Sequence, residues 1–403
     1  MKEFFTGVTQ FVKSHLAVSI ACGVVIVAAV VSLIIFLPGR SAGDLHESES
    51  FSDVLPDDQF SVPEPTLPTP TPSPVPTLTP TPEPVQTDPS HEGEVISVLD
   101  GSWVSEEVAK ARPFAIMFNN IGAANPQSGI GDAKILYEAL AEGGITRLMG
   151  VFEGLTEESS CKDRLGSVRS ARHYFASFAD EYDAVFVHFG ETTYATKKIK
   201  KLKLDHLEGT YAIGDTVFYR DKTIKAPHNA FASLEGILKG IEKSGIRAVH
   251  NDDFKPNHFV FNTVPAVLQN GESASIIKLD YSTYMNPYFV YDGNTGKYTR
   301  YQFDDVHIDK NTEQPLTFDN LIIQLVKEWN KDENGYQDMD IEDSEGNGWY
   351  ITGGKCVPIT WKKNEKQRSM FYYDENGEVL SINPGRTFIS VFPNSRSDKI
   401  VIE

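Results

Sequence analysis

The sequence predicts an α+β fold, with a mixed α/β domain at residues 93–260 and a smaller β-rich domain at residues 261–403. In the first part, apolar stripes of helical period alternate with short apolar runs that are typical of buried strands. In the second part, strand-like runs are separated by tight-turn signals such as Asp-Gly and Asn-Gly. The chain has 403 residues, of which 40% are hydrophobic and 11% aromatic, which is enough to build packed cores.

One transmembrane helix is predicted ahead of these domains. Residues 16–37 carry no charge and would span about 33 Å as a helix, close to the thickness of a hydrocarbon core. Lys2 and Lys13 precede the run and acidic residues follow it, so residues 1–15 are predicted to be cytoplasmic and the C-terminal domains extracellular. The length of the run favours an uncleaved single-pass signal anchor over a cleaved signal peptide. Lipidation of Cys22 is not expected, because the run continues well past it.

Residues 38–92 predict a disordered Pro/Thr-rich linker. The run of alternating Thr and Pro cannot build a core and favours polyproline II at about 3.1 Å per residue. About 25 such residues would hold the next domain some 80 Å from the membrane. The linker therefore indicates that the domains work within or beyond a thick wall layer.

Charge and motifs exclude several classes of function. The formal net charge of −19 argues against a nucleic-acid partner, which requires a basic surface. The sequence has no GxSxG elbow, HExxH pair, Walker loop or paired cysteine ligands, so neither a metal site nor a cofactor is predicted. Cys161 and Cys356 allow at most one disulfide, with none the favoured interpretation.

The α/β domain opens with predicted strands and loops. Residues 113–119 form an apolar run that predicts a strand, and residues 145–152 alternate as a second strand would. Residues 125–129 predict a loop. Residues 133–140 are too few for their period to distinguish a helix from a strand.

Residues 164–190 predict a cationic helix start that leads into a strand. A helix from about Ser167 would bury a stripe of apolar side chains, namely Ala171, Phe175, Phe178 and Tyr182. The strand at residues 183–190 is continuously apolar and is expected to be central in its sheet, with His188 at its carboxyl end.

Cations at this helix start are unfavourable unless a negative group offsets them. The helix dipole is positive there, and Arg169, Arg172 and His173 share one face of the first two turns. A bound anion would offset them. Carboxylates from elsewhere in the fold would do so equally, and the candidates are Glu138, Glu142 and Glu153.

Three more elements are predicted before residue 260. Residues 193–204 form a basic amphipathic segment whose lysines make a solvated face, and residues 211–219 predict a strand and a turn. A helix follows, with a stripe of Phe231, Leu234, Leu238 and Ile241 and with Gly245 as its C-cap. Asn229 is its predicted N-cap, next to His228.

The β-rich domain contains two hairpin signals. They lie at residues 288–303 and 370–382, around Asp292-Gly293 and Asn376-Gly377. Residues 320–329 are too rich in Ile and Val to favour a helix, and residues 383–393 predict a Pro-Gly turn before the last strand.

Taken together, these stretches resemble the YerB-like family of cell-envelope proteins of Gram-positive bacteria, whose members are often lipoproteins. In the first domain the resemblance rests on RPFAIMFNN, NPQSGI, YEALAEGGITRLMGVFE, LGSVRSARHYF, VHFG and APHN. In the second it rests on FVYDGNTGKYTRY, HIDK, GGKCVPITWKK and INPGRTFISVFP. The resemblance implies a mixed α/β domain followed by a β-rich one and carries no catalytic mechanism. This chain departs from it in its apparent transmembrane anchor and in Ser167, where proline is commoner.

The predicted function is that of a membrane-anchored extracytoplasmic protein that binds an anionic or carbohydrate wall component. Arginine suits the phosphate or carboxylate groups of teichoic acids or peptidoglycan stems. The predicted ligand-binding residues are Arg164, Arg169, Arg172, His173, His188, Arg220 and His228, with Asn119, Gln127 and Ser128 as polar loop contacts.

Two other classes of function stay open. One is an envelope-modifying transferase or hydrolase, in which Glu138 or Glu142 is a general base and His188 or His173 an acid. The other is a non-catalytic scaffold for wall enzymes, so that the partner is an envelope protein in place of a cell-wall polymer. The sequence alone does not decide whether the protein is an enzyme.

Overall fold

The computed structural model describes residues 91–252, 254, 259–364 and 367–403. The predicted anchor at residues 16–37 and nearly all of the predicted linker lie outside the described residues. Among the described residues, no helix combines the length and apolar character needed to cross a bilayer. Cys161 and Cys356 are both buried free thiols.

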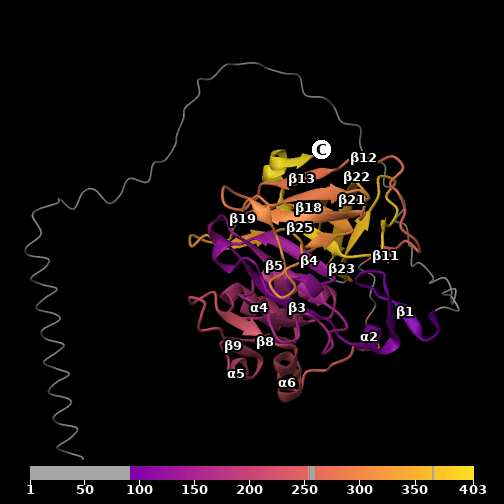
Figure 1. Cartoon of the computed structure of the whole chain (residues 1–403). Helices are drawn as coiled ribbons and strands as arrows, with labels where there is room; N and C mark the ends of the chain where they lie inside the picture. The colour runs from indigo at the N-terminus through magenta and orange to yellow at the C-terminus, as the bar shows by residue number, and fades with distance from the viewer. Residues whose placement is uncertain (1–90, 253, 255–258, 365–366) are drawn as a thin grey trace, which may run out of the picture. The chain divides into compact units, whose positions relative to one another are not determined.

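One eleven-stranded sheet joins the two halves of the sequence, so that colours from both halves meet in it (Figure 1). Its strands follow the order β12-β22-β21-β18-β25-β4-β5-β3-β7-β8, with β23 paired to β22. β25 runs parallel to β18 on one side and to β4 on the other. The strands are β3 (Phe114–Asn120), β4 (Ile135–Leu140), β5 (Thr146–Phe152), β7 (Val185–His188), β8 (His206–Glu208), β12 (Glu272–Ser273), β18 (Asn320–Val326), β21 (Ser344–Thr352), β22 (Lys355–Asn364), β23 (Gln367–Tyr373) and β25 (Thr387–Pro393).

The strands predicted at residues 113–119 and 145–152 are confirmed as β3 and β5, and residues 133–140 contain strand β4. The prediction that β7 is central is wrong, because only β8 lies beyond it in the sheet. All four residues of β7 are nevertheless buried. A continuous apolar run indicates that both faces of a strand are buried. A strand near the edge of a sheet is also buried on both faces when helices cover them.

Helices α3 (His173–Glu181) and α4 (Thr193–Leu202) belong to the core on one face of the sheet, with Met117 and Tyr137. The predicted helix start near Ser167 is wrong, since α3 begins at His173. β7 pairs with β3 only as far as Ile116. The later residues of β3 form backbone hydrogen bonds with residues 167–169, just before α3. The Asn119 N–H donates to the Ser167 carbonyl oxygen at 2.9 Å, and the Arg169 N–H to that of Met117 at 3.0 Å.

The opposite face of the sheet packs on helix α6 and on a second sheet, which share one apolar core. The second sheet has six strands in the order β16-β15-β14-β13-β26, with β17 paired to β15. These elements are α6 (Leu234–Ser244), β13 (Ile276–Leu279), β14 (Tyr288–Asp292), β15 (Lys297–Gln302), β16 (Asp305–Val306), β17 (Thr317–Phe318) and β26 (Ile400–Ile402).

Short elements complete the described fold. Three form a small sheet in the order β6-β10-β9, and β11 pairs with β24. They are β1 (Glu94–Ile96), β2 (Trp103–Ser105), α2 (Glu106–Lys110), η2 (Gly122–Ala124), η3 (Ile130–Asp132), η4 (Glu142–Gly144), β6 (Leu165–Gly166), α5 (Gly214–Val217), β9 (Phe218–Arg220), β10 (Ala230–Ala232), β11 (Val260–Phe261), β19 (Glu328–Asn330), β20 (Gln337–Met339), β24 (Ser381–Ile382) and η5 (Asn394–Lys399).

The turn chemistry of the second half was predicted well. The hairpin at residues 288–303 is confirmed as β14 and β15, joined through Asp292 opposite Lys297. The turn near Asn376 follows β23, but the returning chain makes one bridge and then pairs as β24 with β11. β25 follows the Pro-Gly turn as predicted, although β26 comes after it, so it is not the last strand.

The ends of α6 differ from the prediction at one position. Gly245 is the C-cap, with a φ of 64°, as predicted, but the N-cap is Ser233 and not Asn229. Residues 230–232 form strand β10, so the helix begins four residues later than predicted. Leu238 is 49% exposed, and residues 211–219, predicted as a strand and a turn, contain helix α5 and the first two residues of strand β9.

Replacing Ser233 with Ala is expected to lower the free energy of unfolding by about 1 kcal/mol. The Ser233 hydroxyl accepts a hydrogen bond from the Gly236 N–H at 3.1 Å, and this first-turn donor would lose its partner. Urea unfolding followed by circular dichroism measures the loss. Ser233→Asp supplies another N-cap acceptor and should retain most of the stability, so an equal loss in both variants would contradict the capping role.

Candidate functional site

A cluster of arginines lies beside the start of α3, where the last residues of β3 face the first residues of β5. Arg147 on β5 is directly opposite Asn119 on β3. Its neighbour Thr146 points to the other face of the sheet, where its hydroxyl donates to Glu138 at 2.6 Å. Because side chains alternate along a strand, Arg147 is directed toward the α3 side.

Arg147 is a buried cation with unused donors. Its side chain is almost fully buried, at 3% exposure, and its Nε and Nη1 have no hydrogen-bond partner among the described residues. Burial, followed by the positive charges of Arg172 and Arg169, lowers the pKa of Arg147 to about 9. Arg147 is therefore still charged at neutral pH, while two of its nitrogens lack the hydrogen bonds that normally offset a buried charge.

Arg169 brings a second guanidinium to the same place. It is the last residue of the stretch that pairs with β3, and it is only partly buried. Its Nη1 donates to the Pro227 carbonyl oxygen at 3.2 Å, and its buried Nε has no partner. Burial, followed by the charges of Arg172 and Arg220, lowers the pKa of Arg169.

Neutral polar groups lie on the paired segments that carry the two arginines. The Oδ1 of Asn119 and the Oγ of Ser167 are buried and have no partner among the described residues. The Asn119 amide Nδ2 donates to His228 Nδ1 at 2.8 Å, so the neutral imidazole of His228 carries its proton on Nε2. Burial and the charges of Arg169 and Arg147 lower the pKa of His228. We call Arg147, Arg169, Asn119, Ser167 and His228 the guanidinium cluster.

Arg172 is held by a carboxylate of the protein. Its Nε donates to both carboxylate oxygens of Glu142, at 2.7 and 2.9 Å, and its Nη2 donates to Glu142 Oε2 at 2.5 Å. Its Nη1 donates to the carbonyl oxygens of Ser170 and Ala171. The sequence left open whether a bound anion or a carboxylate of the protein offsets the cations at this helix start. For Arg172 it is a carboxylate of the protein, Glu142.

Three other predicted residues have side chains that bond within the fold, and one of them, Gln127, contacts the backbone of Asn119. Arg164 pairs with Asp221 at 2.8 Å, donates to the Ser128 hydroxyl at 3.1 Å and stacks on Phe231. Gln127 is fully buried, donates to the Asn119 carbonyl oxygen at 2.8 Å and accepts from His307. Since their polar atoms are already bonded, Arg164, Ser128 and Gln127 support the fold.

Arg220 and His173 differ in their distance from the cluster. Arg220 is exposed, donates to Asn229 Oδ1 at 2.8 Å and lies near enough to Arg169 to lower the pKa of that residue. It therefore belongs to the rim of the cluster. His173 instead pairs through Nε2 with Asp338 at 2.6 Å.

His188 does not face the arginines. Its Nε2 lies 3.0 Å from His206 Nδ1, and its Nδ1 lies 3.0 Å from the Gly190 carbonyl oxygen. Burial, followed by the charge of His206, lowers the pKa of His188 to about 3. The predicted site that combined His188 with Arg169, Arg172 and His228 is therefore wrong in including His188. The position of His188 at a strand end did not show which partners its imidazole has.

The predicted catalytic carboxylates are engaged elsewhere. Glu138 is fully buried and pairs with the fully buried Arg300 at 2.8 Å, while Asn120 donates to its other oxygen at 3.0 Å. Glu142 is the partner of Arg172. A general base must reach the proton it removes, so Glu138 is structural and Glu142 holds the helix start.

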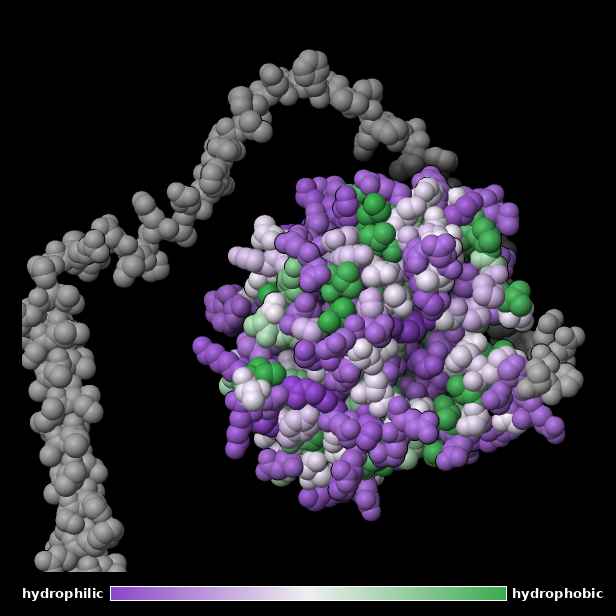
Figure 2. Space-filling view, viewed as in Figure 1, coloured by the Kyte–Doolittle hydropathy of each residue, from purple (hydrophilic) through white to green (hydrophobic). Residues whose placement is uncertain are grey.

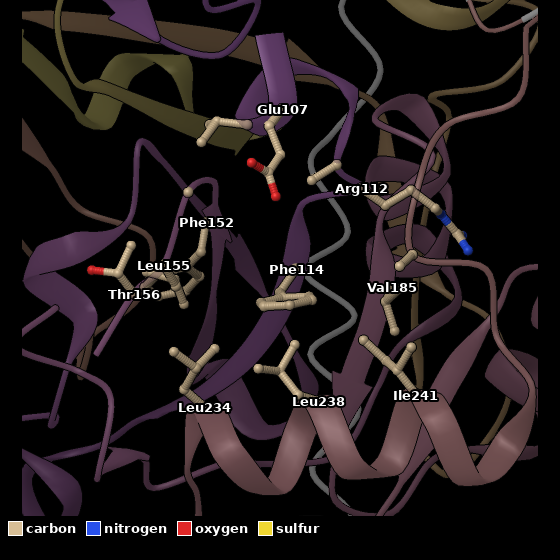
Figure 3. A pocket seen from close by; sticks show the side chains of 14 residues that line it. Glu107, Arg112, Phe114, Phe152, Leu155, Thr156, Val185, Leu234, Leu238 and Ile241 are labelled. Carbon is tan, nitrogen blue, oxygen red and sulfur yellow. The ribbon is translucent and has the colours of Figure 1, made fainter. Parts of the chain in front are cut away.

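An apolar pocket of about 440 Å³ lies apart from the cluster, over α6 (Figure 3). Phe114, Phe152, Leu238 and Ile241 line it, and Arg112 is drawn away from it by Asp205 at 2.6 Å. The surface in the view of Figure 2 is otherwise mainly hydrophilic, with apolar residues scattered over it.

Sequence reasoning missed Arg147 and Ser167 as members of the site. A single arginine between apolar residues in a predicted strand is a signal of a buried charge, and Arg147 in ITRLMG has this pattern. Ser167 gave no signal, because it was placed at the start of a helix.

Comparisons with known proteins cover both halves of the described chain. Family models described as "Protein of unknown function (DUF3048)" match residues 99–247, for the N-terminal domain, and residues 277–389, for the C-terminal domain. The chain is 31% identical over 299 residues to a protein of Bacillus subtilis (strain 168) named "Putative lipoprotein YerB", covering 73% of this chain and 86% of YerB. The crystal structure of YerB from Bacillus subtilis matches with a TM-score of 0.66 at 28% identity, over 77% of this chain and 99% of that one.

The matches confirm the resemblance inferred from the sequence motifs and the two-domain organisation. In this chain, strands from both matched regions share the eleven-stranded sheet, since β25 lies between β18 and β4. The chain belongs to the DUF3048 family and is similar to YerB of Bacillus subtilis.

Proposed function

We propose that this protein is an extracytoplasmic cell-envelope protein that binds a phosphate or carboxylate group of a cell-wall polymer at the guanidinium cluster. The observation that carries the proposal is the state of Arg147, a buried cation whose Nε and Nη1 have no partner. Leaving such donors unsatisfied is costly, and an anion that accepts from them would remove the cost.

The composition of the cluster fits an oxyanion better than a metal or an apolar ligand. Arg147 and Arg169 supply planar donor forks, and His228 offers an Nε2–H. Asn119 Oδ1 and Ser167 Oγ add an acceptor and a hydroxyl that suit the hydroxyl groups of a sugar or polyol next to the anion. Such a mixture suits a phosphate-linked or carboxylate-bearing carbohydrate.

The location in the envelope rests on two independent features. YerB, to which the chain is similar, carries the name "Putative lipoprotein YerB". In this chain the uncharged run at residues 16–37 would act as a single-pass anchor, with a cytoplasmic N-terminus. The Pro/Thr-rich residues that follow would then carry the domains into the wall.

Binding is favoured over acid–base catalysis at this site. Glu142 is the carboxylate next to the cluster, and Arg172 binds both of its oxygens. This pairing lowers the pKa of Glu142 against the opposing effect of burial. A carboxylate whose charge is held in this way is a weak base, so we assign it to positioning Arg172.

The test is retention of the full-length chain, solubilised in a mild detergent, on isolated Gram-positive cell wall at physiological salt. Arg169→Gln is expected to weaken binding about 10- to 100-fold, as the loss of one charged hydrogen-bonding group predicts. Walls with and without teichoic acid distinguish polymer phosphate from peptidoglycan carboxylate, and retention should decrease as salt rises.

Arg396→Gln is the matched control. It makes the same change in net charge, at an exposed arginine of η5 whose Nη1 donates to the Tyr281 carbonyl oxygen at 2.6 Å. Its binding should equal that of the wild type. Equal weakening in both variants would mean that net charge alone drives retention, and no retention of the wild type would overturn the proposal.

A further inference from the structure

Two histidines and a glutamate converge at the ends of β7 and β8, away from the guanidinium cluster. β7 ends at His188, Glu191 follows three residues later, and His206 begins the parallel neighbour β8. The distance from His188 Nε2 to His206 Nδ1 is 3.0 Å, and from His188 Nε2 to Glu191 Oε2 it is 3.8 Å. The three ligand atoms all lie within 4.8 Å of one another.

The orientation of His188 is fixed by the backbone. Its Nδ1 lies 3.0 Å from the carbonyl oxygen of Gly190, which only accepts hydrogen bonds, so Nδ1 carries the proton. The lone pair on Nε2 therefore points toward His206 and Glu191. A histidine that donates to a carbonyl through one nitrogen and presents the other is the arrangement found around bound metals.

Glu191 provides a second, independent observation. Its side chain is 8% exposed, and its buried Oε2 has no hydrogen-bond partner among the described residues. The other oxygen, Oε1, accepts from Tyr211 at 2.8 Å and from Thr196 at 2.9 Å. Two donors thus orient the carboxylate while its second oxygen stays unsatisfied beside two imidazole nitrogens, where a cation would satisfy it.

We propose that His188, His206 and Glu191 form a binding site for a divalent transition metal, with Zn²⁺ the best fit. Two nitrogens bound tetrahedrally at about 2.0–2.1 Å from zinc are roughly 3.3 Å apart, close to the 3.0 Å between the histidines. Mg²⁺ and Ca²⁺ prefer oxygen ligands, whereas imidazole suits Zn²⁺ and its neighbours. Three protein ligands leave a fourth position open.

Such a site would be mechanically tied to the guanidinium cluster. The Phe189 N–H donates to the Arg169 carbonyl oxygen at 3.1 Å, and the Ala171 N–H to that of Gly190 at 3.0 Å. The loop from His188 to Glu191 thus lies against the segment that carries Arg169. A metal bound to both ends of this loop would hold the segment in place.

The test is a Zn²⁺ titration of the untagged full-length chain, stripped with a chelator, by calorimetry in the presence of a competing chelator. The wild type is expected to bind one Zn²⁺ per chain at this site. His206→Gln and Glu191→Gln should weaken it at least about 100-fold, and Tyr211→Phe about 10- to 100-fold, because Tyr211 only orients Glu191. Circular dichroism shows that each variant is folded.

His91→Gln is the matched control, since His91 and Glu94 form an exposed pair at 2.6 Å that supplies only two ligands. Its affinity for Zn²⁺ should equal that of the wild type. No binding by the wild type, or full affinity in folded His206→Gln and Glu191→Gln, would overturn the proposal. Binding of cell wall is measured separately, so the failure of one proposal leaves the other standing.

Discussion

Replacing Glu138 with Gln is expected to lower the free energy of unfolding by about 3–5 kcal/mol, because it leaves the charge of Arg300 buried without its partner. Both side chains are fully buried, and Arg300 Nη2 donates to Glu138 Oε2 at 2.8 Å. Asn120 and Thr146 donate to Glu138 Oε1 at 3.0 and 2.6 Å. Urea unfolding of the full-length chain, followed by tryptophan fluorescence, measures the loss.

The same pair connects the two regions that the family models match. Arg300 lies on β15, and its Nη1 bonds to His307, whose Nε2 donates in turn to Gln127 Oε1 at 2.5 Å. Arg300 is therefore connected to the N-terminal matched region twice, directly through Glu138 and through His307 to Gln127. Loss of Glu138 should loosen the packing of the second sheet on the first.

Glu235→Gln is the matched control for this prediction. It makes the same chemical change in an exposed pair with Lys239 at 2.5 Å, where solvent screens the interaction. Its effect on unfolding should be far smaller. If Glu138→Gln and Arg300→Gln were each as mild as this control, the buried pair would contribute little to the stability of the fold.

The sequence predicted strands better than the boundaries of helices. β3, β5 and the hairpin of β14 and β15 follow from local alternation and turn residues. The start of α3 was missed because residues 167–169 satisfy an edge of β3 that lies about fifty residues earlier in the sequence. No local sequence pattern predicts this long-range pairing. The pairing of β25 with β4 cannot be predicted from local patterns either.

The candidate site was predicted in part for a related reason. The structure brings Arg169, His228 and Asn119 together, and each of them is next to a predicted strand end or helix start. The sequence did not show that the His188 imidazole bonds to His206 and Gly190, which keeps it out of the cluster. The pairing of β5 with β3 places Arg147 opposite Asn119 and adds it to the cluster. The difference between Arg172 and Arg169 depends on Glu142, which is thirty residues away from Arg172.

Arg147→Met is expected to separate ligand binding from stability. Methionine has nearly the same length and an apolar side chain, so it would fill the space without the uncompensated buried charge. The free energy of unfolding should stay the same or rise. Binding to isolated cell wall should fall about 100-fold, because two unused donors and a positive charge are removed together.

This combination of effects distinguishes a ligand-binding arginine from a structural one. A structural arginine, such as Arg300, destabilises the fold when it is removed, because its partners lose their bonds. Arg147 has two nitrogens without such bonds, and burial and the nearby arginines outweigh the attraction of Glu142 for its charge. The charge therefore does not stabilise the fold on balance until an anion binds. A soluble teichoic acid fragment at 100 times its Kd should stabilise the wild type by about 2.7 kcal/mol in thermal unfolding. The same fragment at the same concentration should stabilise Arg147→Met far less. Severe destabilisation of the variant with unchanged binding would instead assign Arg147 to the core.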